Sequence, residues 1–251
     1  MYLTNNLTAL AIIPGLLLIL YVYGKDKVEK EPLPLIFKLV LFGVISCILA
    51  GEAESIASQF LPSYAPGTLE YALTTSFCLA AFWEEILKFL ALKLGSWKHP
   101  SFNYRFDGIV YGVSAAVGFA VFENVMYVAQ YGLQTAIVRA FTAVPLHAFC
   151  GVFMGVFYSY AKKASVLGMN GAKFGFNVLA LIVPMLIHGC YDTLAFLRTE
   201  ASTYGLLVFV VILYISAIRT IKKNSAEDYK AGFYPAARPI EYDVRFTDDN
   251  N

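Results

Sequence analysis

Ionisable side chains occur inside the long apolar stretches of this chain, where their presence needs an explanation. Two of the three histidines and several carboxylates lie there. The set comprises Glu84, Glu85, Lys88, Glu123, His147, His188 and Asp192. An ionisable group in hydrocarbon costs several kcal/mol, so such groups usually mark a functional site. Side chains of these types transfer protons, activate water and bind metals.

The spacing of these residues indicates which side chains act together. His188 and Asp192 are four positions apart, so they share one face of a helix. An aspartate at that distance orients or polarises an imidazole, or supplies a second metal ligand. Glu84 and Lys88 have the same separation, which lets the lysine neutralise Glu84 or its neighbour Glu85. Adjacent helical residues point about 100° apart, so at most one of the two glutamates faces the centre of a site.

Two chemical roles remain open for this set. A buried glutamate can act as general base for water, with the histidines stabilising an oxyanion. Two histidines with carboxylates also form a plausible zinc shell, and we predict His147, His188 and Glu123 as ligands.

Positions along the chain place the groups in one layer. At 1.5 Å per helical residue, His147 and Glu123 lie about 12 Å from the nearest polar edge, His188 about 15 Å and Asp192 about 9 Å. Unrelated buried charges would not share a depth. We therefore expect one polar chamber between four helices, in the outer half of a bilayer.

The composition requires a membrane protein around this chamber. Of 251 residues, 58% are hydrophobic and 15% charged, and the mean hydropathy is +0.61. A soluble domain has roughly 25% charged residues and cannot hide so much apolar surface, and disorder is excluded too. The apolar stretches are long and do not alternate, which favours helices over a barrel. The net charge of +1 gives no indication of nucleic acid, and the four cysteines are expected to be small buried hydrophobic residues.

Run length predicts an all-α bundle of about seven membrane helices. The predicted spans are 7–23, 33–60, 71–92, 107–130, 140–161, 174–197 and 203–221. Among the lysines and arginines outside the spans, Arg139 and Arg198 lie on one side and all the others on the opposite side. This asymmetry predicts an outside N-terminus and a cytoplasmic C-terminus. Residues 1–222 then form the membrane domain, and 223–251 a polar, flexible cytoplasmic tail.

The ordered motifs resemble those of the PrsW family, glutamate-dependent intramembrane proteases of the CAAX-protease-related superfamily. The resemblance rests on Glu84-Glu85-x-x-Lys88, Phe119-x-x-x-Glu123-Asn124, His147 and His188-x-x-x-Asp192. It extends to Pro14-Gly15, to the segment from Tyr21 to Pro32, to the segment from Asp107 to Gly112 and to Arg139-Ala140, and covers roughly residues 12–200.

The resemblance implies a function and a catalytic set. The function is site-1 cleavage of a membrane-anchored anti-sigma factor in the bacterial cytoplasmic (inner) membrane. Glu84 and Glu85 are the implied essential pair, and Glu123, His147, His188 and Asp192 complete the set. In related CAAX-type proteases a histidine takes the position of Glu123, so the motif leaves open which group assists the water-activating residue.

Other interpretations of the residues remain. Buried acids and histidines also build proton relays, so a proton-coupled transporter or channel is one alternative. A CAAX-type or bacteriocin-processing membrane protease is another. Glu52 and Glu54, near an outer helix end, are expected to face water or lipid headgroups.

Overall fold

A computed structural model describes residues 2–228, which fold into helices with no strand among them. The helices are α1 (Tyr2–Lys25), α2 (Leu33–Ser58), α3 (Leu69–Leu73), the π-helical segment η1 (Thr74–Ala81), α4 (Phe82–Ser96), α5 (Asp107–Tyr131), α6 (Leu133–Phe141), α7 (Ala143–Val166), α8 (Asn170–Phe196) and α9 (Glu200–Glu227). The predicted all-α polytopic bundle is confirmed.

Six helical stretches are long and apolar enough to cross a membrane. They are Thr8–Lys25, Leu33–Ser58, Asp107–Tyr131, Leu133–Val166, Asn170–Leu197 and Glu200–Glu227. The predicted span 71–92 is not among the six. It is helical, but it is divided into α3, η1 and α4, and three charged residues lie within positions 84–88. The cost of these charges in lipid is avoided because they face the interior of the bundle.

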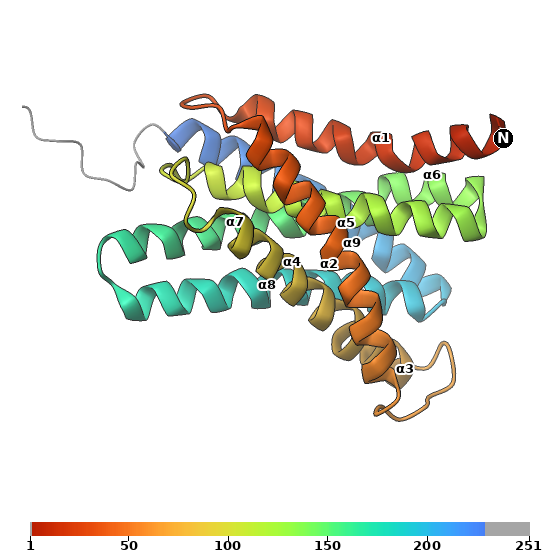
Figure 1. The fold of residues 1–251 in the computed structure, drawn as a ribbon. Coiled ribbons are helices and arrows are strands. Elements are labelled where there is room, and N and C mark those ends of the chain that lie inside the picture. The colour runs from red at the N-terminus through yellow and green to blue at the C-terminus, as the bar shows by residue number, and fades with distance from the viewer. Residues whose placement is uncertain (1, 229–251) are drawn as a thin grey trace, which may run out of the picture.

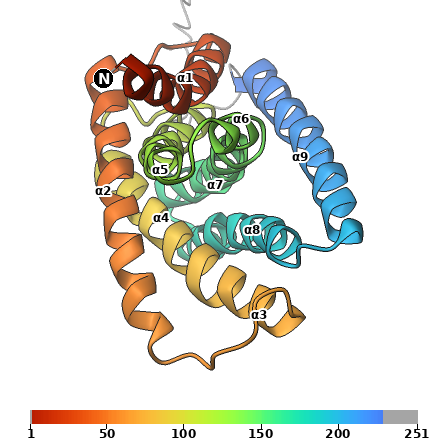
Figure 2. The ribbon, with the colours of Figure 1, turned by 90° about the vertical axis from the view of Figure 1, so that its right-hand side faces the viewer.

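Helices α5 and α7 form the centre of the bundle, surrounded by α1, α2, α4, α8 and α9 (Figure 2). Small residues let the two central helices approach closely. A Cβ atom on Gly151 of α7 would lie 2.6 Å from the Gly112 carbonyl oxygen of α5, and one on Gly155 would lie 2.7 Å from the Gly108 carbonyl carbon. Without a hydrophobic driving force between helices in lipid, such close van der Waals packing holds them together.

Two further features place the surrounding helices. Helices α2 and α4 pack side by side and run obliquely across α5 and α7 (Figure 1). Gly132 separates α5 from α6 with φ of 81°, a backbone conformation that side chains rarely adopt. It lets the chain reverse, so that the short helix α6 runs back beside the end of α5.

Helix α9 continues past residue 222, where we predict the membrane domain to end. Helix α9 continues to Glu227, and the buried Asp228 accepts a hydrogen bond from the Phe106 amide at 2.8 Å. Ser225 donates to the Lys25 carbonyl, and Arg105 forms an ion pair with Glu227 at 2.9 Å. The packing of the helix therefore continues past residue 222. The rest of the predicted tail, 229–251, lies outside the described residues.

Candidate active site

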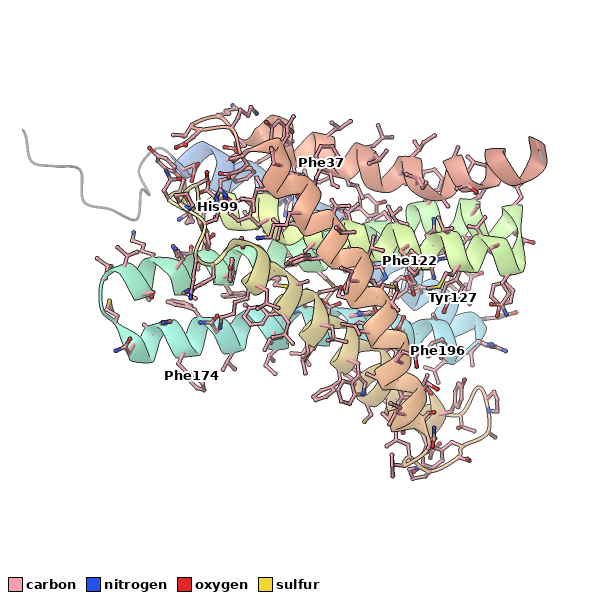
Figure 3. The ribbon with its side chains drawn as sticks, viewed as in Figure 1. Phe37, His99, Phe122, Tyr127, Phe174 and Phe196 are labelled. Carbon is pink, nitrogen blue, oxygen red and sulfur yellow. The ribbon has the colours of Figure 1, made fainter. Side chains whose placement is uncertain are left out.

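All six predicted catalytic residues meet in one place, contributed by four helices. Glu84 and Glu85 come from α4, Glu123 from α5, His147 from α7, and His188 and Asp192 from α8. The third histidine, His99, lies at the opposite end of the bundle from Tyr127 and Phe196, two residues of the cavity described below (Figure 3).

Lys88 occupies the centre of the cluster and is 1% exposed. Its Nζ atom lies 3.0 Å from Glu84 Oε2, 2.9 Å from Glu85 Oε1 and 2.9 Å from His147 Nδ1. An ammonium group has three protons, and these three partners use all of them. The same group lies 3.9 Å from the ring centroid of Phe119. Lys88 thus forms ion pairs with both Glu84 and Glu85, and not with only one of them.

These contacts define the tautomer of His147. Because Lys88 can only donate, Nδ1 of the imidazole must accept, and the ring proton must be on Nε2. That nitrogen lies 3.0 Å from Glu123 Oε2 and donates to it. His147 therefore links α4 to α5 in one defined orientation.

His188 has a carboxylate at each ring nitrogen. Its Nδ1 lies 2.9 Å from Glu85 Oε1, and its Nε2 lies 3.2 Å from Asp192 Oδ2 and 3.9 Å from Glu84 Oε2. A neutral imidazole can donate from one nitrogen only. The cluster must therefore hold a further proton, either on His188 or on one of its carboxyl partners. The predicted pairing of His188 with Asp192 on one helix face is present.

Glu123 is held from a second direction by Arg139 of α6. The guanidinium forms an ion pair with Glu123 Oε2 at 2.5 Å, donates to Asn124 Oδ1 at 2.9 Å, and lies 4.0 Å from the Tyr127 ring centroid. The reversal at Gly132 makes this contact possible, because it folds α6 back onto α5.

A cavity of about 440 Å³ opens onto the cluster. Glu84 lines it, whereas Glu85 is fully buried behind it and is absent from the lining. The expectation that at most one of the adjacent glutamates faces the chamber therefore agrees with the structure. His147, His188 and Asp192 also line the cavity.

Helix α2 contributes a cavity wall that the sequence analysis missed. Glu54, which we expected to face water or headgroups near a helix end, lines the cavity. A signal was present in the sequence. The lining residues of α2 recur at positions i, i+3, i+4 and i+7, namely Cys47, Ala50, Gly51 and Glu54. Three small residues followed by an acid on one helix face indicate a surface that faces a cavity rather than lipid.

The donor types fit a divalent transition metal. Glu84, Glu85, His147 and His188 each offer one ligand atom, and these four atoms lie within 4.8 Å of one another. Glu85 Oε2 is buried and has no hydrogen-bond partner among residues 2–228, so it remains available as a ligand. Glu123, which we predicted as a ligand, is not in this group. Imidazole and carboxylate together are a ligand set that zinc accepts.

A membrane helix bundle that encloses acids, imidazoles and an ammonium group around a cavity has the residue types that a membrane-embedded hydrolase requires. The sequence model of the PrsW family of intramembrane metalloproteases matches residues 31–217, and the chain belongs to this family. It is an intramembrane endopeptidase.

Curated relatives extend over most of the chain. It is 33% identical to Protease PrsW of Bacillus subtilis, over 84% of this chain and 92% of the relative. It is 31% identical to Protease PrsW of Geobacillus kaustophilus, over 87% and 92%. It is 29% identical to Protease PrsW of Clostridioides difficile, over 91% and 95%. No solved structure matches the chain.

Proposed function

We propose that this protease performs site-1 cleavage of a membrane-anchored anti-sigma factor, with Glu84 activating the attacking water. The observation that carries the catalytic assignment is the position of Glu84. Its carboxylate lines the cavity, while the Lys88 ammonium contacts it from the protein side. A carboxylate that is both exposed to a cavity and electrostatically supported suits a general base.

The proton then follows a short route. Glu84 Oε2 takes one proton from water as the oxygen attacks the scissile carbonyl carbon. It returns that proton to the nitrogen of the leaving amine, so the carboxylate is regenerated. Lys88 and Glu85 keep their own charges during both proton transfers, so the electric field that they create at Glu84 does not change.

The two histidines stabilise the developing oxyanion. Both rings line the cavity, but their nitrogens contact Lys88 and carboxylates in this structure. An imidazole N–H must therefore leave its carboxylate partner to donate to the oxyanion, whose negative charge it then stabilises. Asp192 holds His188 through Nε2 at 3.2 Å, and Glu123 holds His147 through Nε2 at 3.0 Å. These carboxylates position the rings rather than contact the scissile bond.

A metal, with zinc as our proposal, would be held by the group Glu84, Glu85, His147 and His188. When bound, such an ion lowers the pKa of a coordinated water and polarises a carbonyl group. For part of the ligand set to become free, Lys88 must give up its contacts with Glu84, Glu85 or His147.

We further propose that the protein lies in a bacterial inner membrane with its N-terminus outside. Residues 1–222 and the continuation of α9 then form the protease domain, and the residues that follow face the cytoplasm. The distribution of lysine and arginine supports this orientation. The cavity then lies toward the outer face, where a substrate with an external domain is accessible.

The test uses purified protein in liposomes with each single-span anti-sigma factor of the source organism. We expect cleavage by the wild-type protein and none by Glu84→Gln, which keeps the side-chain shape and removes the base. Glu52→Gln, a change at an exposed residue of α2, is the matched control and should cleave normally. Retained cleavage by Glu84→Gln would refute the catalytic assignment. Cleavage of other membrane proteins only, with every anti-sigma factor intact, would refute the substrate class.

A further inference from the structure

Glu54 is the ionisable residue of the cavity whose role the catalytic cluster does not explain. It is half-buried on α2, four residues before the helix ends at Ser58, and lies in the cavity wall. At 1.5 Å per residue, it is about 6 Å from the end of the helix.

The other acids of the cluster all have a partner. Glu84 contacts Lys88, Glu123 contacts Arg139, and Asp192 contacts His188. Glu85, behind the cavity, contacts Lys88 and His188. Glu54 forms no hydrogen bond and no ion pair with any residue of the described chain, 2–228. The cations nearby are engaged, since Lys88 uses its three protons and Arg139 binds Glu123 and Asn124.

Open space lies one turn away from this carboxylate, at Gly51. One turn before it, Gly51 also lines the cavity, and a Cβ atom added there would meet no atom within 4 Å. The wall beside Glu54 can therefore accommodate an entering chain. An unpaired carboxylate at membrane depth is costly, and a cation that arrives with a ligand removes that cost.

We infer that Glu54 is a specificity residue that binds a lysine or arginine side chain of the substrate, close to the scissile bond. Both side chains have long aliphatic stems, which can lie along the small residues of α2 while the charged end reaches the carboxylate. Basic residues are scarce on the outer flank of membrane spans, so this requirement restricts the set of substrates. The inference rests on the proposed proteolysis and on the proposed orientation.

The experiment maps cleavage sites in a detergent extract of bacterial membrane proteins. The extract is incubated with wild-type protein, Glu84→Gln, Glu54→Gln, Glu54→Lys or Glu52→Gln, and the new N-termini are identified by mass spectrometry. Sites that depend on Glu84 define the protease's own cuts. Among them, we expect lysine and arginine to be enriched at one or two fixed positions beside the cleaved bond.

The variants at position 54 then test the assignment. Glu54→Gln should abolish the enrichment and lower kcat/KM for the basic sites about tenfold or more, because an ion pair at a partly desolvated position is lost. Glu54→Lys should shift the preference to aspartate and glutamate. Glu52→Gln, two positions away and exposed, should leave the wild-type pattern intact. Thermal unfolding of Glu54→Gln should match that of the wild type, since no native contact of Glu54 is removed.

Each contrary outcome identifies what has failed. Glu84-dependent sites without basic enrichment, or enrichment that survives in Glu54→Gln, would overturn the role of Glu54 and leave the protease mechanism standing. The absence of any Glu84-dependent site would overturn the proposed catalytic mechanism, and the inference with it.

Discussion

Lys88 donates a hydrogen bond from Nζ to Nδ1 of His147, 59 positions later in the chain, at 2.9 Å. This contact assigns the ring proton of the histidine to Nε2 and thereby directs it to Glu123. One ammonium group thus both balances the two glutamates of α4 and orients an imidazole of α7. Lys88 therefore acts by donating hydrogen bonds in three directions as well as by its positive charge.

Replacement of Lys88 should therefore impair both stability and activity. Lys88→Met leaves two buried glutamates without their shared cation, and removal of one partner of a buried ion pair costs about 3–5 kcal/mol. Lys88→Arg should fail to restore activity, because a planar guanidinium cannot direct three donors as an ammonium group does. Thermal unfolding and kcat/KM on a membrane-anchored substrate measure the two effects. Lys93→Met, in the last turn of α4, is the control. Normal activity of Lys88→Arg would contradict the assigned hydrogen-bond geometry of Lys88.

Asp192 should act on the reaction through His188. Asp192→Asn keeps an oxygen that can accept from Nε2, whereas Asp192→Ala removes the partner altogether. We expect Ala to lower kcat/KM about 10- to 100-fold, in the range seen for partners that orient catalytic ligands, and Asn to lower it less. Unfolding temperatures should change little in both variants. Equal loss in Asn and Ala would mean that the negative charge, and not the orientation of the ring, is what matters.

Gly132 should be required for the position of α6. Its φ of 81° with ψ of −161° lies in a region that is essentially restricted to glycine, so Gly132→Ala should cost about 1–3 kcal/mol. Activity should fall as well, because α6 carries Arg139 to Glu123. Gly171→Ala, where the added Cβ meets no atom within 4 Å, is the matched control and should unfold like the wild type. A Gly132→Ala variant with wild-type unfolding and activity would show that the reversal tolerates a side chain.

Gly151 should tolerate no side chain. A Cβ there would lie 2.6 Å from the Gly112 carbonyl oxygen and 2.8 Å from Ala116 Cβ, and backbone cannot move aside as a side chain can. Overpacking of this kind costs about 1–3 kcal/mol. Because His147 is one turn away, separation of α5 and α7 should also lengthen its contact with Glu123 and lower activity. Unfolding curves of Gly151→Ala and of the open-space control Gly175→Ala would show whether the loss is specific.

Stability should depend on pH through Glu31, in the loop between α1 and α2. Burial raises the pKa of Glu31 to about 7 from its ordinary value of 4.5, although hydrogen bonds with Tyr111 and Asp107 oppose the rise. The folded protein therefore holds this proton more tightly than the unfolded chain does. The stabilisation is complete below the unfolded pKa and is lost as the pH rises through the folded pKa.

Glu31→Gln should weaken that dependence, because the amide stays neutral and its oxygen still accepts from the Tyr111 hydroxyl. The difference in Tm between about pH 5 and about pH 8 should shrink in this variant. Burial also raises the pKa of Asp26 to about 6, so part of the dependence should remain. Glu70→Gln, at an exposed position of α3, should behave like the wild type. An unchanged difference in Tm would show that Glu31 does not titrate in this window.

The sequence was sufficient to predict the helical bundle and to name the six ionisable residues that the structure brings together. Run length located the membrane helices, because lipid demands internal hydrogen bonding over a fixed thickness. The number of residues between each side chain and the nearest polar edge placed Glu123, His147 and His188 in one layer, because the rise per residue of a helix is constant.

The contacts between helices could not be predicted from the sequence. The face shared by Glu84 and Lys88 follows from periodicity, but the rotation of α4 that also directs Lys88 to His147 depends on packing against α5 and α7. The division of the third span by a π-helical segment leaves no signal in hydropathy. The position of Glu54 near a helix end does not reveal that its side chain lines the cavity, because that depends on how α2 packs against the other helices.

The residues of the active site are distributed along the chain in a way that bears on biogenesis. Glu85 and His188, which bond at 2.9 Å, are separated by 103 positions. A ribosome that has inserted α4, α5 and α7 has delivered the general base and one imidazole, but neither His188 nor Asp192. On the proposed mechanism, proteolysis begins only after α8 enters the membrane, so the nascent chain is protected from its own activity until the bundle is nearly complete.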